Sequence, residues 1–193
     1  MILFSCDNVQ SKIELLREAW TQLISDFQKA GKYCHMGEED LRCYFFCKIL
    51  HKIEESEYSS EGNFHPLDLH AEQKLTEVDS ERLDLVFGLS NENGWDIGIE
   101  IKRTLDGIEE DLQKLQKYMR QKKIKAGILV AILTGKTDPI AYFNKNIIPT
   151  YQLQSENLEG QNYIEWDRIQ IHSDKLEFWE AVFVALRTID EAT

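Results

Sequence analysis

Three charged side chains interrupt two short apolar segments of the sequence. Asp84 lies within RLDLVF at positions 82–87, and Glu100 and Lys102 lie within IGIEIK at positions 97–102. Charged residues rarely occur inside apolar strands unless they are paired or bind a metal. Two carboxylates and a lysine on one face of a sheet are the groups that metal-assisted phosphodiester cleavage uses. We therefore take Asp84, Glu100 and Lys102 as the candidate catalytic residues.

The two segments are expected to form a hairpin that brings these residues together. Alternation along each strand puts Glu100 and Lys102 on the face of Asp84. It puts the apolar set on the other face: Leu83, Leu85, Phe87, Ile97, Ile99 and Ile101. A five-residue loop over Ser90–Gly94 places Asp84 opposite Glu100, and a three-residue loop places it opposite Lys102. A two-residue Asn93–Gly94 turn would turn Asp84 to the wrong face, so we expect the longer loop.

Length and composition predict one domain over residues 1–193, with a core of about 37–134 and a C-terminal extension of about 135–193. The composition, 42% hydrophobic and 29% charged, is typical of a globular protein. No apolar run approaches the length of a membrane span, and the first residues lack the pattern of a signal peptide. We therefore expect no membrane partner and a cytoplasmic protein.

The charge distribution bears on nucleic-acid binding. The net charge of −12 argues against a general nucleic-acid coat. The segment 117–125 nevertheless holds five bases and no acid. Two interpretations stand side by side: a solvated helix end, or a phosphate-contacting patch that includes Arg120, Lys122 and Lys123.

The periodicity of apolar residues predicts the order of elements. We expect helices over 11–30, 37–55, 106–122 and 174–189, strands over 67–75, 82–87, 97–102 and 126–134, and an irregular region over 135–160. Asp106 is expected to cap the third helix, with Glu109 completing a capping box. The resulting fold class is α/β: a mixed central sheet with an αβββαβ core, helices on both sides, and extra N-terminal and C-terminal helices.

This order, with Asp84 on one strand and Glu100-Ile101-Lys102 on the next, resembles the PD-(D/E)XK nuclease superfamily over roughly residues 37–134. Leu83 stands where the family often has proline. The resemblance implies Mg²⁺, with Mn²⁺ as a substitute, held by Asp84, Glu100 and the Ile101 carbonyl. It implies that Lys102 orients or deprotonates the attacking water, or stabilises the developing charge. A lysine beside two carboxylates without metal would be an ordinary salt bridge.

In such enzymes a carboxylate on the helix before the sheet often completes the site; Glu38 is our choice, with Glu39 close behind. Glu72 is either a supporting residue or an exposed strand residue. The helix after the sheet often carries a facing Gln or Lys, which suggests Gln113 and Lys117. We expect a homodimer acting on DNA, because one small domain contacts few phosphates. The alternative is a non-catalytic binding or interaction module that keeps the nuclease fold.

The cysteines allow two interpretations. Cys34, Cys43 and Cys47, with His51 on the same helical stripe as the last two, could bind a metal. No Cys-x-x-Cys pair is present, however, so buried free thiols are the preferred interpretation.

Overall fold

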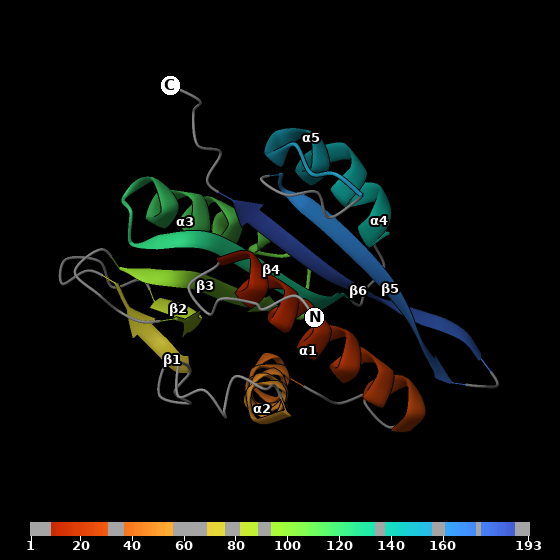
Figure 1. The fold of residues 1–193 in the computed structure, drawn as a ribbon. Helices are drawn as coiled ribbons and strands as arrows, with labels where there is room; N and C mark the ends of the chain where they lie inside the picture. Colours follow the sequence, from red (N-terminus) through yellow and green to blue (C-terminus); the bar gives the residue numbers. More distant parts are fainter. Residues whose placement is uncertain are drawn as a thin grey trace.

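The described chain folds around a six-stranded mixed sheet with strand order β1-β2-β3-β4-β6-β5. The computed structural model describes residues 9–30, 37–55, 69–75, 82–88, 94–133, 138–155, 161–172 and 175–187. In chain order the elements are α1 (Val9–Ala30), α2 (Glu38–Glu55), β1 (Leu69–Lys74), β2 (Arg82–Phe87), β3 (Trp95–Lys102), α3 (Ile108–Arg120), β4 (Ile124–Leu133), α4 (Pro139–Tyr142), the π-helical η3 (Phe143–Ile147), α5 (Ile148–Tyr151), β5 (Tyr163–His172) and β6 (Lys175–Arg187). Figure 1 shows the sheet with helices against it.

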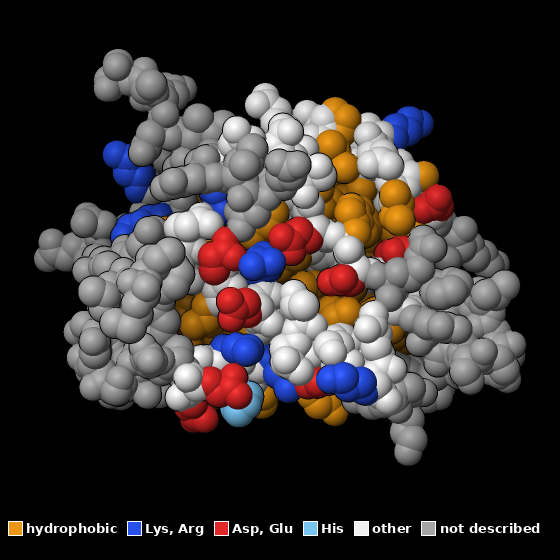
Figure 2. Space-filling view, turned by 45° about the vertical axis from the view of Figure 1, so that its right-hand side comes forward, with side chains coloured by type: hydrophobic (Ala, Val, Ile, Leu, Met, Phe, Trp, Pro, Cys, Tyr) orange, Lys and Arg blue, Asp and Glu red, His pale blue; other side chains and the backbone are white. Residues whose placement is uncertain are grey.

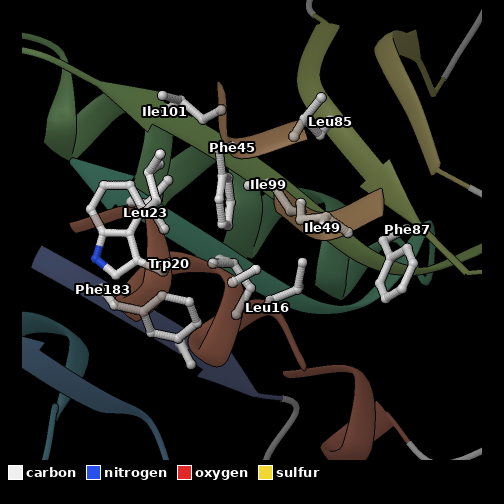
Figure 3. Close-up of a cluster of buried hydrophobic side chains, with 14 of the residues drawn as sticks. Leu16, Trp20, Leu23, Phe45, Ile49, Leu85, Phe87, Ile99, Ile101 and Phe183 are labelled. Carbon is white, nitrogen blue, oxygen red and sulfur yellow. The ribbon is translucent and has the colours of Figure 1, made fainter. Parts of the chain in front are cut away.

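Helices cover both faces of the sheet, because β3, β4 and β6 bury side chains on each face. Helices α1 and α2 pack on one face, where the Trp20 and Phe45 rings meet edge to face at 5.5 Å and lie near Ile99 (Figure 3). Helix α3 and the α4–η3–α5 segment pack on the other, through residues such as Leu112 and Phe143. Strand β3 runs parallel to β4, and the other neighbouring pairs are antiparallel. The predicted mixed α/β class is confirmed.

The C-terminal segment is a strand, so the predicted helix over 174–189 is wrong. Strand β6 pairs antiparallel with β4, for example Val182 with Ala131, and with β5 along its other edge. Its residues alternate between the two cores: Phe183 faces α1 and α2, whereas Val182 and Val184 face α3. An apolar run buried on both faces satisfies the helical spacing as well as the strand spacing, which misled the sequence interpretation.

The region expected to be irregular, 135–160, contains a helical stretch instead. Helices α4 and α5 flank the π-helical η3, and together they run from Pro139 to Tyr151. Asp138 begins this stretch, since its Oδ1 accepts hydrogen bonds from the backbone N–H groups of Ile140 and Ala141. Proline at the first helical position and an aspartate cap are a start signal that the sequence displayed.

Three local expectations are also corrected. Helix α3 begins after Gly107, which has a φ of 81° and no side-chain cap, so Asp106 does not cap it. Cys43 and Cys47 are exposed on α2 rather than buried, and Cys34 lies outside the described residues. His51 pairs with Glu55 instead of extending a cysteine cluster. Among the described helices, none combines the length and apolar character needed to cross a membrane.

The expected register of the β2–β3 hairpin is confirmed. Leu85 pairs with Ile99 and Phe87 with Ile97, which is the register of a five-residue loop, although residues 90–93 of that loop lie outside the described residues. The pairing stops at Leu85, so Asp84, the residue before it in the chain, is unpaired in the β2–β3 ladder. There the alternation breaks, because Leu83 joins the α3-side core rather than the core of Leu85, contrary to the prediction.

Candidate active site

The candidate site lies where β2 separates from β3. Beyond the Leu85–Ile99 pair, the Asp84 side chain connects β2 to β3 in place of backbone pairing. Its Oδ2 accepts a hydrogen bond of 2.8 Å from the Ile101 backbone N–H. The separation of the strands therefore exposes a short length of β3 backbone to a carboxylate. This contact holds Asp84 beside the Glu100-x-Lys102 segment, as the sequence predicted for these residues.

Glu100 is the most deeply buried of these side chains. It is 2% exposed, and its Oε1 lies 2.7 Å from Nζ of Lys114 on α3. Burial raises the pKa of Glu100 to about 9, with repulsion from Asp111 and Asp84 adding to the effect; the attraction of Lys114 offsets only part of it. Burial also raises the pKa of Asp84, although the hydrogen bond from Ile101 acts against this. Three carboxyl groups thus lie close together, and Glu100 holds a proton more readily than an exposed carboxyl group does.

Helix α3 supplies two residues that sequence reasoning missed. Asp111 is 7% exposed, and its Oδ2 lies 3.0 Å from Lys102 Nζ. Lys114 reaches Glu100 and also donates to the Arg82 carbonyl at 3.1 Å, so it spans the gap between β2 and β3. The signal was present in the sequence: Asp111 interrupts the apolar stripe formed by Ile108, Leu112 and Leu115.

Lys102 lies between α3 and α2. It contacts Asp111 at 3.0 Å and Glu38 at 3.8 Å. Partial burial lowers the pKa of Lys102, but the bond to Asp111 and the nearby charges of Glu38 and Asp84 outweigh it and raise the pKa overall. Lys102 is therefore a charged hydrogen-bond donor at neutral pH.

The predicted supporting carboxylates lie around the rim of the site. Glu38 is exposed, and its Oε1 lies 3.8 Å from Lys102 Nζ. Arg42, which the sequence did not single out, pairs with the other two, Glu72 at 2.9 Å and Glu39 at 3.6 Å. It also lies 3.6 Å from Asp84. Because α2 begins at Glu38, this arginine on its second turn faces the edge of β1 and β2.

The two residues predicted on α3 do not occupy the positions expected for them. Gln113 is exposed, and the Lys117 ammonium lies over the Tyr118 ring at 5.6 Å from its centroid. Asp111 and Lys114 take the inward-facing positions instead. Gln113 and Lys114 are neighbours in the chain and so point in directions about 100° apart around the helix, and no sequence motif fixed the rotation of α3.

The carboxyl groups of the site bear on its fit to a divalent cation in two ways. No three His, Cys, Asp or Glu side chains within the described residues gather as a metal site in this arrangement; Lys102, Lys114 and Arg42 pair with the carboxylates instead. Glu100 Oε1 and Asp111 Oδ2 are nevertheless buried without a well-formed hydrogen bond, although an ammonium lies near each. Buried carboxylate oxygens that lack a well-formed hydrogen bond fit a hard cation such as Mg²⁺.

Helix α3 is held from outside by the α4–η3–α5 segment. The Tyr142 hydroxyl donates to Glu109 Oε1 at 2.6 Å, and the Tyr151 hydroxyl donates to the Glu109 carbonyl at 3.4 Å. The sequence suggested that Glu109 completes a capping box, but the structure does not show one. The Glu109 side chain instead accepts the hydrogen bond from Tyr142. It links the first turn of α3, which carries Asp111, to a second element.

The predicted nucleic-acid contacts lie at the other end of β3. Arg120, Lys122 and Lys123 are exposed at the end of α3 and in the turn before β4. Trp95 pairs with Ile124 beside this turn, whereas Lys102 pairs with Ala131, seven residues further along β3. At ~3.3 Å per residue, the basic turn is roughly 23 Å from the candidate site.

Acidic and basic side chains are mixed, with apolar side chains between them, on the face shown in Figure 2. Any nucleic-acid binding by this face would therefore depend on local contacts rather than on a broad basic surface. No family model, no curated protein and no solved structure matches this chain.

Proposed function

We propose that this chain is a metal-dependent nuclease that hydrolyses phosphodiester bonds of DNA through Asp84, Glu100 and Lys102. One observation carries the proposal: carboxyl groups from β2, β3 and α3 converge where the sheet opens, and an oxygen of Glu100 and one of Asp111 are buried without a well-formed hydrogen bond. Such an arrangement is costly for folding alone. The resemblance of Asp84 and Glu100-x-Lys102 to the PD-(D/E)XK pattern supports the same function.

Asp84, Glu100 and the Ile101 carbonyl would hold Mg²⁺ or Mn²⁺, and Asp111 is the nearest further carboxylate. A cation bound there supplies polarisation of the phosphate and a water of lowered pKa. The bond from the Ile101 N–H fixes one Asp84 oxygen and leaves the other, Oδ1, toward Arg42. The backbone N–H of Ile101 thus orients the Asp84 carboxylate.

Lys102 acts as a donor rather than as a base, because its raised pKa keeps it protonated at neutral pH. Asp111 holds the ammonium at 3.0 Å and so positions it beside the carboxylates. In this role Lys102 orients the attacking water or stabilises negative charge that develops on the phosphoryl oxygens.

Cleavage of labelled DNA with Mg²⁺ or Mn²⁺ tests the proposal. Single-stranded, duplex, flapped and branched DNA, with RNA alongside, are incubated with wild type, Lys102→Ala and Glu100→Gln. Lys145→Ala and Glu18→Gln are matched controls, because both residues are exposed and lie on η3 and α1. Cleavage by wild type and both controls, but not by the two site variants, is expected. Equal cleavage by all five proteins would point to a contaminant and refute the assignment.

We also propose that the active form is a homodimer, because a chain of this size contacts few phosphates by itself. Light scattering after gel filtration, with and without DNA, measures the mass directly. A monomer that cleaves DNA at full rate would refute the dimer and leave the nuclease intact.

The second candidate is a non-catalytic module that keeps this fold. It is favoured by the pairing of Glu100 with Lys114 and of Asp111 with Lys102, which can serve as an internal ion network. Calorimetric titration with Mn²⁺ separates the two candidates. Binding by wild type that disappears in Glu100→Gln supports the nuclease, whereas no binding together with no cleavage supports the module.

A further inference from the structure

The start of β3 carries an aromatic pair beside a basic turn. The rings of Trp95 and His70 meet edge to face with centroids 4.9 Å apart, and His70 is exposed on the edge strand β1. The Trp95 backbone N–H donates to the Lys123 carbonyl at 2.8 Å, which fixes the turn against the strand. Exposed Lys122 and Lys123 therefore project from the same end of the sheet as an indole that is only partly buried.

We propose that Trp95, His70, Lys122 and Lys123 bind single-stranded nucleic acid and lead the strand toward the candidate site; this group of residues is termed the β3 platform. Aromatic rings beside basic side chains are the combination that binds single strands, since bases stack on the rings while cations contact phosphates. The link to cleavage rests on the proposed function, but the binding does not.

A single strand fits this surface better than a duplex. Bases within a duplex are already stacked on each other and do not offer their faces to a side chain. A duplex would also require many phosphate contacts across a protein with a net charge of −12. The β3 platform supplies few cations but offers a ring surface, which matches the needs of an unpaired strand.

The position of the platform determines how a strand reaches the site. His70 pairs with Val86, and Val86 with Gly98, so His70 lies across the sheet between the start of β3 and Glu100. The roughly 23 Å from Trp95 to Lys102 equals about seven stacked nucleotides at 3.4 Å each, and fewer if the strand is extended. Oligonucleotides too short to span this distance when extended reach either the platform or the site, but not both.

The turn offers a variant that separates binding from folding. Lys122 has a φ of 57°, a conformation that asparagine adopts at lower energy than lysine. Lys122→Asn thus removes a charge while favouring the native turn. The test protein is Lys122→Asn/Lys123→Ser, and the matched control is Lys29→Ser/Lys145→Ser, which removes two exposed lysines from α1 and η3. Trp95→Leu removes the ring and keeps an apolar side chain.

Fluorescence anisotropy measures binding of labelled oligonucleotides, about 4 to 16 nucleotides long, in EDTA so that no cleavage occurs. We expect Lys122→Asn/Lys123→Ser to weaken binding about tenfold and to reduce the salt slope by about 1.4, since each phosphate contact contributes about 0.7 for a single strand. We expect Trp95→Leu to weaken binding by roughly five- to a hundredfold. The lysine control should bind like wild type, and thermal melting checks that every variant is folded.

Each outcome decides between the two proposals. Equal weakening by the lysine control, no binding by wild type, or an undiminished affinity of Lys122→Asn/Lys123→Ser overturns the platform. Tighter binding of duplex than of single strands overturns the choice of ligand. Platform-dependent binding without cleavage under Mg²⁺ or Mn²⁺ retains the platform and refutes the nuclease. Cleavage with an unchanged KM in the platform variants retains the nuclease and refutes the platform.

Discussion

Strand β3 carries two buried carboxylates, and their surroundings differ in charge balance. Asp96, near its start, is 6% exposed and pairs with Lys12 of α1 and with Lys125 of β4, the latter at 2.6 Å. Glu100, four residues later, has Lys114 at 2.7 Å but also faces Asp84 and Asp111. One carboxylate thus has two cations, and the other shares its surroundings with two further carboxylates.

The pKa shifts of the two carboxylates follow this difference. Burial raises the pKa of Asp96, but its hydrogen bonds and ion pairs with Lys12 and Lys125 outweigh burial and lower the pKa overall. The pKa of Glu100 rises to about 9 because burial and like charges act together. A carboxylate paired with two cations ties elements of the fold together, whereas a cluster of mutually repelling carboxyl groups retains affinity for a further cation.

The largest effect is expected on cleavage. Glu100→Gln removes a charge that the proposed reaction needs, and Lys102→Ala removes a donor to the developing charge, so each should lower kcat by about 10²- to 10³-fold. Single-turnover cleavage of a fixed DNA substrate measures the loss. Asp96→Asn, on the same strand, should keep the rate of wild type per folded molecule. A comparable loss in Asp96→Asn would remove the distinction between the two clusters.

The second effect is on stability and has the opposite pattern. Asp96→Ala leaves two lysines without their carboxylate, one of them buried, and should lower the free energy of unfolding by about 3 to 5 kcal/mol. Urea denaturation followed by circular dichroism measures this loss. Glu100→Gln keeps the shape of the side chain and relieves repulsion, so its loss should be clearly smaller. The comparison fails if Glu100→Gln is the more destabilising substitution.

The third prediction concerns pH in the absence of metal. The pKa of Glu100 is about 9 in the folded chain and near 4.5 when unfolded, so between these values the native state binds more protons than the unfolded state. The free energy of unfolding should therefore fall as pH rises from about 5 to about 9. Denaturation curves in EDTA at several pH values should show this slope in wild type and a smaller one in Glu100→Gln.

Asp96 should behave in the reverse sense. Its folded pKa lies below its ordinary value of 3.8, so its stabilisation is present above that pH and is lost as pH falls through the folded pKa. Asp96→Asn should consequently flatten the acid side of the stability profile and leave the neutral-to-alkaline slope unchanged. A neutral slope that persists in Glu100→Gln would show that another group causes it.

Much of the β2–β3 hairpin could be predicted from the sequence because period-two alternation and loop length restrict the register. Leu85 pairs with Ile99 as the alternation required, and Asp84 accordingly lies beside Glu100-x-Lys102. The break in alternation at Leu83 could not be predicted, because it arises where the Asp84 side chain replaces a ladder contact.

The remaining differences come from faces that the sequence does not distinguish. Strand β6 is apolar on both faces, so helical and strand spacing fitted it equally. Asp96 gains a partner from far away in the chain, because Lys12 reaches it from α1, 84 residues earlier. Arg103 donates to the Ile132 carbonyl at 2.9 Å and lies over Trp179. Such partners are set by tertiary packing rather than by local spacing.

The smallest expected effect tests whether the outer tyrosine supports the carboxyl cluster of Asp84, Glu100 and Asp111. Tyr142→Phe removes the hydroxyl that donates to Glu109 at 2.6 Å, and one such hydrogen bond contributes about 1 kcal/mol to stability. Because Glu109 lies two residues before Asp111, a looser first turn of α3 should also lower kcat a few-fold through the position of Lys102, with KM unchanged. Tyr44→Phe is the matched control, since Tyr44 is 50% exposed on α2. If Tyr142→Phe lowers stability while kcat stays at the value of the control, the α4–η3–α5 segment stabilises α3 without positioning Lys102.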